Sequence, residues 1–164
     1  MNNPLVIRTP PAEGAWVLHP PTDPWGDGYV VVMQVELHDE GLSARREVKL
    51  SWPTQTEEPD LVAFFQGLAD DWRGWDGERG WRSLDAGMWI TAQHDGKGHV
   101  TLGATLQKHS HSPDAWLARV FITLEAGEQM SALVADLRSH LRTLSSGEGV
   151  RCSGPAGEAD VVEE

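Results

Sequence analysis

Two groups of alternating segments constrain the fold of this chain more than any other feature of its sequence. The segment YVVVMQVEL is followed by DEG and then by LSARREVKL, in which apolar and polar residues alternate strictly. Because successive side chains of a strand point to opposite faces, this pattern predicts a half-buried antiparallel hairpin. MWITAQHD and HVTLGATLQ predict a second hairpin, AWLARVFITL predicts a further strand, and PLVIR near the start is a candidate for another.

Each group of strands is followed by a segment whose apolar residues recur at helical spacing. These segments are EEPDLVAFFQGLADDWRG and GEQMSALVADLRSHLR. The sequence therefore predicts an α+β fold in the order strands, helix, strands, helix, with a mostly antiparallel sheet of about five to six strands and two helices on one face. The predicted buried positions of the helices are Leu61, Phe64, Phe65, Leu68 and Trp72 in the first, and Met130, Leu133, Val134, Leu137 and Leu141 in the second.

The 164 residues favour one domain, which we place at residues 1–144. Within it, residues 9–28 contain five prolines and predict an irregular loop crossing the surface. Residues 145–164 are rich in serine, glycine and acidic residues, and they have too little apolar mass to fold, so we predict a disordered acidic tail. The single cysteine, Cys152, falls in this tail and excludes a disulfide within the chain.

The formal net charge of −12 narrows the classes of partner. Binding to nucleic acid or to an anionic membrane needs a surface rich in lysine and arginine, so neither is expected. An acidic surface is compatible with a basic protein partner such as a toxin, since opposite charge accelerates encounter. The N-terminus lacks the pattern of a signal peptide, and no apolar run approaches the ~18 residues of a membrane span. We therefore expect a cytoplasmic protein.

Tryptophan is concentrated in the segment WRGWDGERGW, residues 72–81, and a fourth tryptophan follows at Trp89. Trp72 lies eleven residues after Leu61 on the predicted helical stripe, and Gly74 suits the left-handed residue that ends a helix. This spacing favours a structural corner in which the rings are internal. The alternative is a platform on which a ligand stacks.

The same region carries a resemblance to known proteins. The motifs WRGWDGERGWRSL, HDGKGHVTL and LEAGEQMSALVADLRSHL resemble a family of short actinobacterial proteins of uncharacterised function, over roughly residues 60–142. More loosely, the chain is similar to WapI-type immunity proteins, which neutralise a partner toxin. The resemblance implies a binding function and brings no catalytic residues with it.

Histidines are the candidates for metal binding, because His94 and His99 flank one loop while His109 and His111 lie in another. A three-residue hairpin loop with Gly98 in the left-handed position pairs Asp95 with His99. His94 then faces Val100, and the two histidines lie on opposite faces of the hairpin. We therefore expect no metal site. The sequence also lacks a G-x-S-x-G nucleophile motif and a phosphate-binding loop, so neither catalytic residues nor a cofactor are predicted.

Three functional hypotheses remain open. The first is a non-catalytic protein that acts by binding, with an immunity-like role, through the acidic residues beside the tryptophan segment. The second is a small-ligand binder or enzyme with a tryptophan-lined pocket between the sheet and the helices. The third is a homodimer formed through sheet edges or an uncovered sheet face, and its alternative is a monomer. The candidate residues are Asp70, Asp71, Trp75, Asp76 and Glu78 for the first, Trp75, Trp81 and Trp89 for the second, and Trp89, Thr91, Thr105, Arg45 and Lys49 for the third.

Overall fold

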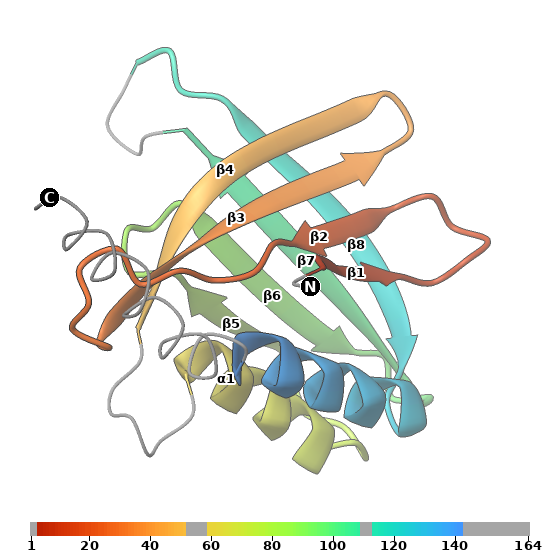
Figure 1. The fold of residues 1–164 in the computed structure, drawn as a ribbon. Coiled ribbons are helices and arrows are strands. Elements are labelled where there is room, and N and C mark those ends of the chain that lie inside the picture. The colour runs from red at the N-terminus through yellow and green to blue at the C-terminus, as the bar shows by residue number, and fades with distance from the viewer. Residues whose placement is uncertain (1–2, 52–58, 109–112, 143–164) are drawn as a thin grey trace, which may run out of the picture.

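The strands of the protein form two antiparallel sheets of four strands each, in the computed structural model that describes residues 3–51, 59–108 and 113–142. The N-terminal sheet has the order β1-β2-β3-β4, and the C-terminal sheet has the order β5-β6-β7-β8 (Figure 1). The N-terminal sheet consists of β1 (Leu5–Arg8), β2 (Ala15–Leu18), β3 (Val30–Asp39) and β4 (Leu42–Ser51). The C-terminal sheet consists of β5 (Glu78–Arg82), β6 (Met88–His94), β7 (His99–Gln107) and β8 (Leu117–Glu125).

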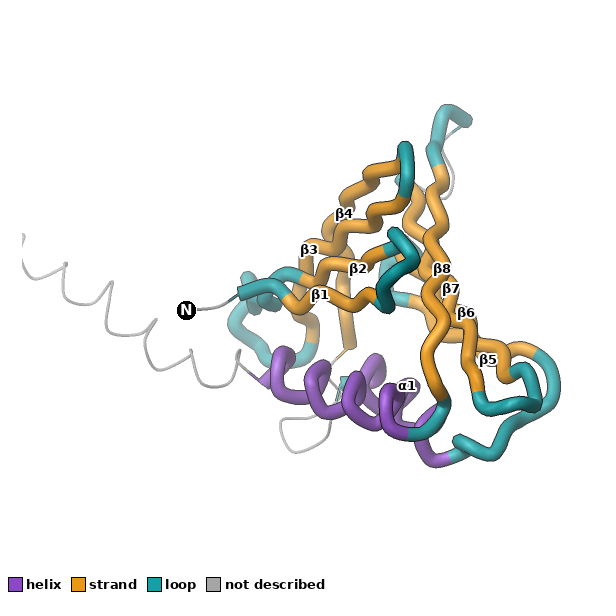
Figure 2. Tube along the Cα trace, turned by 90° about the vertical axis from the view of Figure 1, so that its right-hand side faces the viewer, coloured by secondary structure: helices purple, strands orange, loops and turns teal. Residues whose placement is uncertain are grey.

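Two helices lie across the opening between the sheets. Helix α1 (Asp60–Asp70) connects the sheets, and a second helix, residues 128–142, follows β8 and is blue in Figure 1. Figure 2 shows the sheets converging at one end, with both helices across the other end. Because each sheet and each helix has one apolar face, this arrangement lets all four bury those faces against one another.

One hydrophobic core serves both sheets and both helices. The second helix buries its predicted apolar positions, from Met130 at 0% exposed to Leu133 at 6% exposed. The alternating strands likewise turn one set of side chains inward, and β8 alternates buried and exposed residues along its whole length. The largest fully buried side chains are Trp16, Phe65, Met33, Leu37, Leu50, Leu61, Leu68, Met88, Ile90, Leu102, Leu106 and Met130.

Trp16 joins the two sheets where β2 crosses β8. Its indole is 1% exposed, and Nε1 donates a hydrogen bond to the carbonyl of Val120 at 3.1 Å. The backbone beside it approaches closely as well, since a Cβ atom on Gly14 would lie 2.9 Å from the carbonyl oxygen of Phe121. Gly14, two residues before Trp16, therefore permits the close approach of β2 to β8 that buries the indole.

Arg46 of β4 makes a second connection between the sheets. Its guanidinium donates to the carbonyls of Gln107 and Lys108 at the end of β7, and it lies 3.4 Å from the carboxylate of Asp85. Burial raises the pKa of Asp85, but hydrogen bonds from Ser83 and Gly87 and the charge of Arg46 outweigh it, so the pKa is lowered overall.

The prediction of one sheet with five to six strands and two helices on one face is wrong, because the strands divide into two sheets. Two short strands account for the difference in number. Residues 9–28 were predicted as a loop but contain β2, and the tryptophan segment contains β5. With four and five residues respectively, both strands are too short for alternation to stand out among prolines and glycines.

The division into two sheets also corrects the predicted dimer face. Trp89, Thr91 and Thr105 belong to the C-terminal sheet, whereas Arg45 and Lys49 belong to the N-terminal sheet. Both predicted hairpins are present, and the predicted pairing of His94 with Val100 is confirmed. The predicted tail, residues 145–164 with Cys152, and the histidines at 109 and 111 lie outside the described residues.

Replacing Trp16 by phenylalanine is expected to lower the free energy of unfolding by about 1–3 kcal/mol. The change removes the Nε1–H donor, leaves the Val120 carbonyl unpaired between the sheets, and opens a small void. Equilibrium denaturation in urea measures the effect. Trp25→Phe is the matched control, because that indole is 55% exposed and should change the free energy by less than about 0.5 kcal/mol. Equal effects would contradict the role of Trp16.

Candidate functional site

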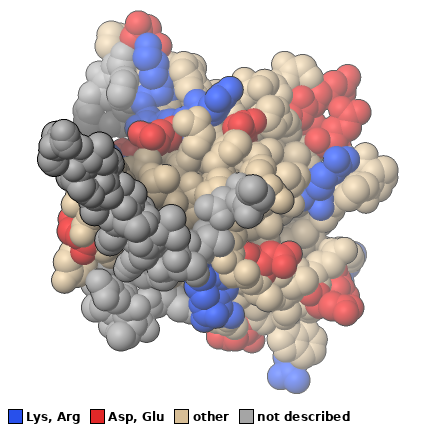
Figure 3. Space-filling view, in the orientation of Figure 1, with Lys and Arg blue, Asp and Glu red and all other residues tan. Residues whose placement is uncertain are grey.

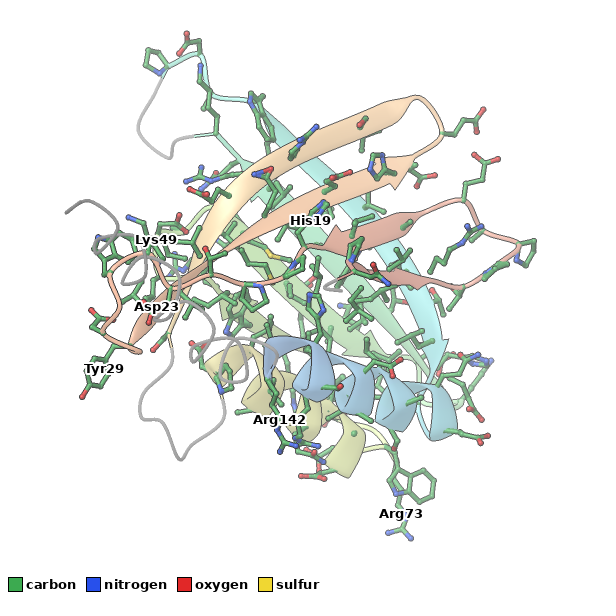
Figure 4. The ribbon with its side chains drawn as sticks, viewed as in Figure 1. His19, Asp23, Tyr29, Lys49, Arg73 and Arg142 are labelled. Atoms are coloured by element: carbon green, nitrogen blue, oxygen red, sulfur yellow. The ribbon has the colours of Figure 1, made fainter. Side chains whose placement is uncertain are left out.

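The end of α1 and the loop behind it expose a tryptophan among acidic residues. The helix ends at Asp70, and the backbone N–H of Asp71 donates to the carbonyl of Gly67. Trp72 was predicted on the buried stripe of the helix, and that prediction is wrong. It lies beyond the helix, is 49% exposed, and stacks on the guanidinium of Arg73 with 4.9 Å between the guanidinium carbon and the ring centroid. Arg73 projects away from the body of the protein in Figure 4.

Arg79 of β5 holds this loop against the sheet. Its guanidinium stacks on the ring of Trp75 at 4.7 Å from the centroid and forms an ion pair with Asp71 at 2.8 Å. Trp75 itself packs against the hydrophobic core. The loop is thus fixed to β5 by one apolar and two electrostatic contacts.

His94, the last residue of β6, fixes the loop from the other side. Its Nδ1 accepts the backbone N–H of Gly96 at 2.9 Å, so its Nε2 carries the proton and donates to the carbonyl of Trp72 at 2.9 Å. The imidazole also meets Trp75 edge to face, with ring centroids 5.4 Å apart. Gly74 allows this approach, because its φ is +126° and a Cβ atom there would lie 3.1 Å from Nδ1.

The predicted acidic binding residues separate into two places. All four carboxylates are exposed, but Glu78 starts β5 and lies opposite Gln93 of β6. The other three, Asp70, Asp71 and Asp76, lie at the end of α1 and in the loop that follows. We call these three aspartates, together with Trp72 and Trp75, the acidic corner.

A shallow concavity of about 540 Å³ borders the acidic corner. The loop contributes Arg73, Trp75 and Asp76 to its lining, and the β6–β7 hairpin contributes His94 and Asp95. Its polar and charged walls, open to solvent, suit a protein surface better than an enclosed small molecule.

Trp81 and Trp89 point to opposite faces of the C-terminal sheet, and Trp75 borders a different concavity from theirs, so the concavities described do not join the three rings of the predicted pocket. Trp81 pairs with buried Ile90 and packs against the core, while Trp89 faces outward opposite Arg82. Both border a second open concavity of about 550 Å³ on the β5–β6 side of the sheet. The corner hypothesis placed the tryptophan rings inside the protein. These two rings instead border an open concavity.

Several polar atoms near these rings are buried without a hydrogen bond inside the described part of the chain. They are the indole Nε1 atoms of Trp75, Trp81 and Trp89, and Oδ1 of Asp60. Burial raises the pKa of Asp60, while the nearby indole N–H of Trp81 acts in the opposite direction. Asp60 is the first residue of α1 and Trp81 lies in β5, so these two side chains belong to the packing of the helix against the sheet.

The β6–β7 hairpin has the predicted register. His94 lies opposite Val100, Gly98 has a φ of +95°, and Nδ1 of His99 is 3.3 Å from the carboxylate of Asp95. Backbone N–H groups of Lys97 and His99 lower the pKa of Asp95. The two histidines do not converge. Within residues 3–51, 59–108 and 113–142, no group of three histidine, cysteine or acidic residues is arranged to hold a metal ion.

The loop between β2 and β3 exposes two aromatic residues that the sequence analysis did not place in a candidate site. Trp25 is 55% exposed beside Lys49, and Tyr29 is 59% exposed (Figure 4). Asp23 accepts the backbone N–H groups of Gly26 and Gly28, which have φ values of +71° and +75°. The turn residues in TDPWGDGY were the signal, since aspartate and glycine together fix such a loop.

A carboxylate between two histidines lies on the outer face of the N-terminal sheet. Glu36 accepts hydrogen bonds from His38 at 2.8 Å and from His19 at 2.6 Å. The hydrogen bond from His38, followed by that from His19, lowers the pKa of Glu36. His19 enters this cluster through the register of β2 against β3, and sequence reasoning missed it because it missed β2.

Comparison with known proteins identifies a family whose function is unknown. A profile described as a family of unknown function (DUF6228) matches residues 15–143. No curated protein and no solved structure gave a significant match. Among the helices described, none is both long and apolar enough to cross a membrane.

Substituting His94 by alanine is expected to speed amide hydrogen exchange in residues 71–77 roughly tenfold. The change leaves the Trp72 carbonyl and the Gly96 N–H unpaired and removes the edge contact with Trp75. Exchange followed by mass spectrometry measures it. His99→Ala, which removes only the exposed pairing with Asp95, is the control. Unchanged exchange in His94→Ala would show that the loop is ordered by other contacts.

Glu36→Gln is expected to destabilise the protein by roughly 1–2 kcal/mol at pH 7, because an amide binds the two histidines more weakly than a carboxylate. The pKa of Glu36 in the folded state lies below its ordinary value of 4.5. Its contribution is therefore fully present above about pH 4.5 and is lost as pH falls through the lower folded-state value. Urea denaturation at a series of pH values from 7 downward measures this. A difference that did not shrink as the pH falls below about 4.5 would contradict it, and Glu47→Gln on β4 is the control.

Proposed function

The chain belongs to the DUF6228 family, a family of unknown function, and from this premise we propose that it acts without catalysis, by binding another protein at the acidic corner. The exposed indole of Trp72 carries the proposal. Tryptophan is among the residues most often found at the energetic centre of protein interfaces. Here the ring is 49% exposed, on a backbone that His94 and Arg79 hold in place.

The partner fitting this surface is a basic protein. Asp70 and Asp76 are exposed and lie within four residues of Trp72 in the sequence, and the chain as a whole carries a net charge of −12. Opposite charge raises the rate at which two proteins meet, while an aromatic anchor slows their separation. The ordered loop adds to affinity, because little backbone entropy is lost on binding.

The specific role we propose is neutralisation of a toxin in the manner of an immunity protein. The loose resemblance of residues 60–142 to WapI-type immunity proteins supports it. Such a protein needs only to cover the functional surface of its partner, and it needs no reactive group of its own. A tight, acidic binding surface is sufficient for that task.

A small-ligand site on the C-terminal sheet is the second candidate. The concavity of about 550 Å³ beside Trp89 favours it. Aromatic rings stack on sugars and bases, and the ring of Trp89 borders this concavity. The two candidates use different tryptophans, so they can be separated experimentally.

The double variant Asp70→Lys/Asp76→Lys is expected to weaken partner binding by at least roughly tenfold, since it places positive charge against a basic protein. The immobilised full-length chain captures proteins from a lysate of its source cells. The purified product of the adjacent gene is tested separately by calorimetry. Lysine at the end of α1 also suits the helix dipole, so the fold should be retained.

The matched control is Glu13→Lys/Glu40→Lys, which changes the net charge equally. These residues are exposed in the β1–β2 and β3–β4 turns, on the side of the molecule where acidic side chains gather at the right of Figure 3. Equal loss in both double variants would show that only net charge matters. Loss of partner binding in Trp89→Ala but not in Trp72→Ala would contradict an interface at the acidic corner, and the absence of any basic partner would contradict the first candidate function.

A further inference from the structure

Strand β5 forms an open edge of the C-terminal sheet. It comes first in the order β5-β6-β7-β8, and Figure 2 places it on the side of this sheet away from β1–β4. Open edges present backbone N–H and carbonyl groups to which another strand can pair. The properties of β5 therefore decide which strand that would be.

The backbone of Glu78, Gly80 and Arg82 points to the open side. The N–H of Ser83 donates to the carbonyl of Met88 at 2.9 Å, and bonded pairs alternate along an antiparallel ladder. The pairs of Trp81 and Arg79 with β6 are accordingly the bonded ones, so the backbone groups of the residues that alternate with them point away from β6, where the described part of the chain offers them no partner. All three are exposed, and a Cβ atom on Gly80 would meet only the Ile90 carbonyl, at 3.6 Å.

We propose that β5 pairs with β5 of a second copy of this chain, antiparallel about a twofold axis at Gly80. The sequence Glu-Arg-Gly-Trp-Arg is self-complementary in this register. Glu78 of each copy lies opposite Arg82 of the other. Opposite charges directly across strands are favourable, and a symmetric dimer contains this pair twice.

The placement of charge on β5 distinguishes self-pairing from simple protection of an edge. Protective charges usually repel an approaching strand. On β5 the outward charges have opposite sign and stand symmetrically about a glycine, so a second copy is attracted. Two of the other described edges, β8 and β1, are less suited. Along β8 the Val120 carbonyl already accepts the indole of Trp16, and β1 carries a single charge, Arg8.

Pairing at β5 would also cover exposed apolar surface. The concavity of about 550 Å³ is lined by Gly80, Arg82, Trp89 and Thr91 among others, and it lies directly beside the open edge. The missing side chain of Gly80 allows two strands to approach closely at the axis. The surface proposed for the protein partner lies earlier in the chain, from Asp70 to Asp76. The dimer and the proposed function can therefore be tested independently.

A swap of charges tests the proposed register. Sedimentation velocity and light scattering of the full chain should give a mass of about twice 18.0 kDa at high concentration. Glu78→Arg and Arg82→Glu should each raise the dimer dissociation constant roughly tenfold or more, because each turns two attractive pairs into repulsive ones. The double variant E78R/R82E should restore association, since it exchanges the partners of the same pairs.

The controls are Glu40→Arg and Arg8→Glu, which make the same changes in charge at exposed positions away from β5. Amide exchange of Gly80 and Arg82 gives a second measurement that needs no variant, because dimerisation should slow it as concentration rises. A monomer at all concentrations up to the millimolar range overturns the proposal. A dimer that the two single swaps leave intact overturns it equally, because its contact then lies elsewhere.

Discussion

The burial of Trp16 between two sheets is the contact on which the structure depends. Neither sheet could bury its apolar face alone, because strands of the other sheet and the two helices supply the opposing side chains. The indole fills the junction and also satisfies the Val120 carbonyl at the edge of β8. Arg46 does the same for two carbonyls at the end of β7. The sheets are thus joined by side chains that satisfy the backbone of the other sheet.

A core shared in this way leaves function to the outer faces and loops, where exposed aromatic residues are not equivalent. Phe121 is 53% exposed, yet a Cβ atom on Gly103 would lie 2.8 Å from its ring, so the ring rests on a glycine of the neighbouring strand. Its exposure is a by-product of packing within the sheet. Trp72 is 49% exposed on a firmly held backbone, and Arg73 stacks on its ring. That difference is why Trp72, rather than Phe121, anchors the proposed interface.

Sequence reasoning succeeded where one local rule was sufficient. Gly98 and the apolar alternation fixed the β6–β7 register, and helical spacing identified the buried face of residues 128–142. It failed where a segment is defined by its neighbours. The four residues of β2 are a strand only because β1 and β3 flank them, and His19 meets Glu36 only through that pairing. Helical spacing also carried Trp72 into α1, although the helix ends at Asp70.

The segment from Asp70 to Arg82 combines two demands that usually conflict. A binding loop needs exposed groups, and exposed groups are commonly mobile. Here the segment is restrained at three points, by Arg79 on the carboxylate of Asp71, by His94 on the Trp72 carbonyl, and by the ladder of β5 on β6. These restraints leave the side chains of Asp70, Trp72 and Asp76 exposed. Order is therefore gained without covering the surface, which is the condition for tight recognition by a short stretch of chain.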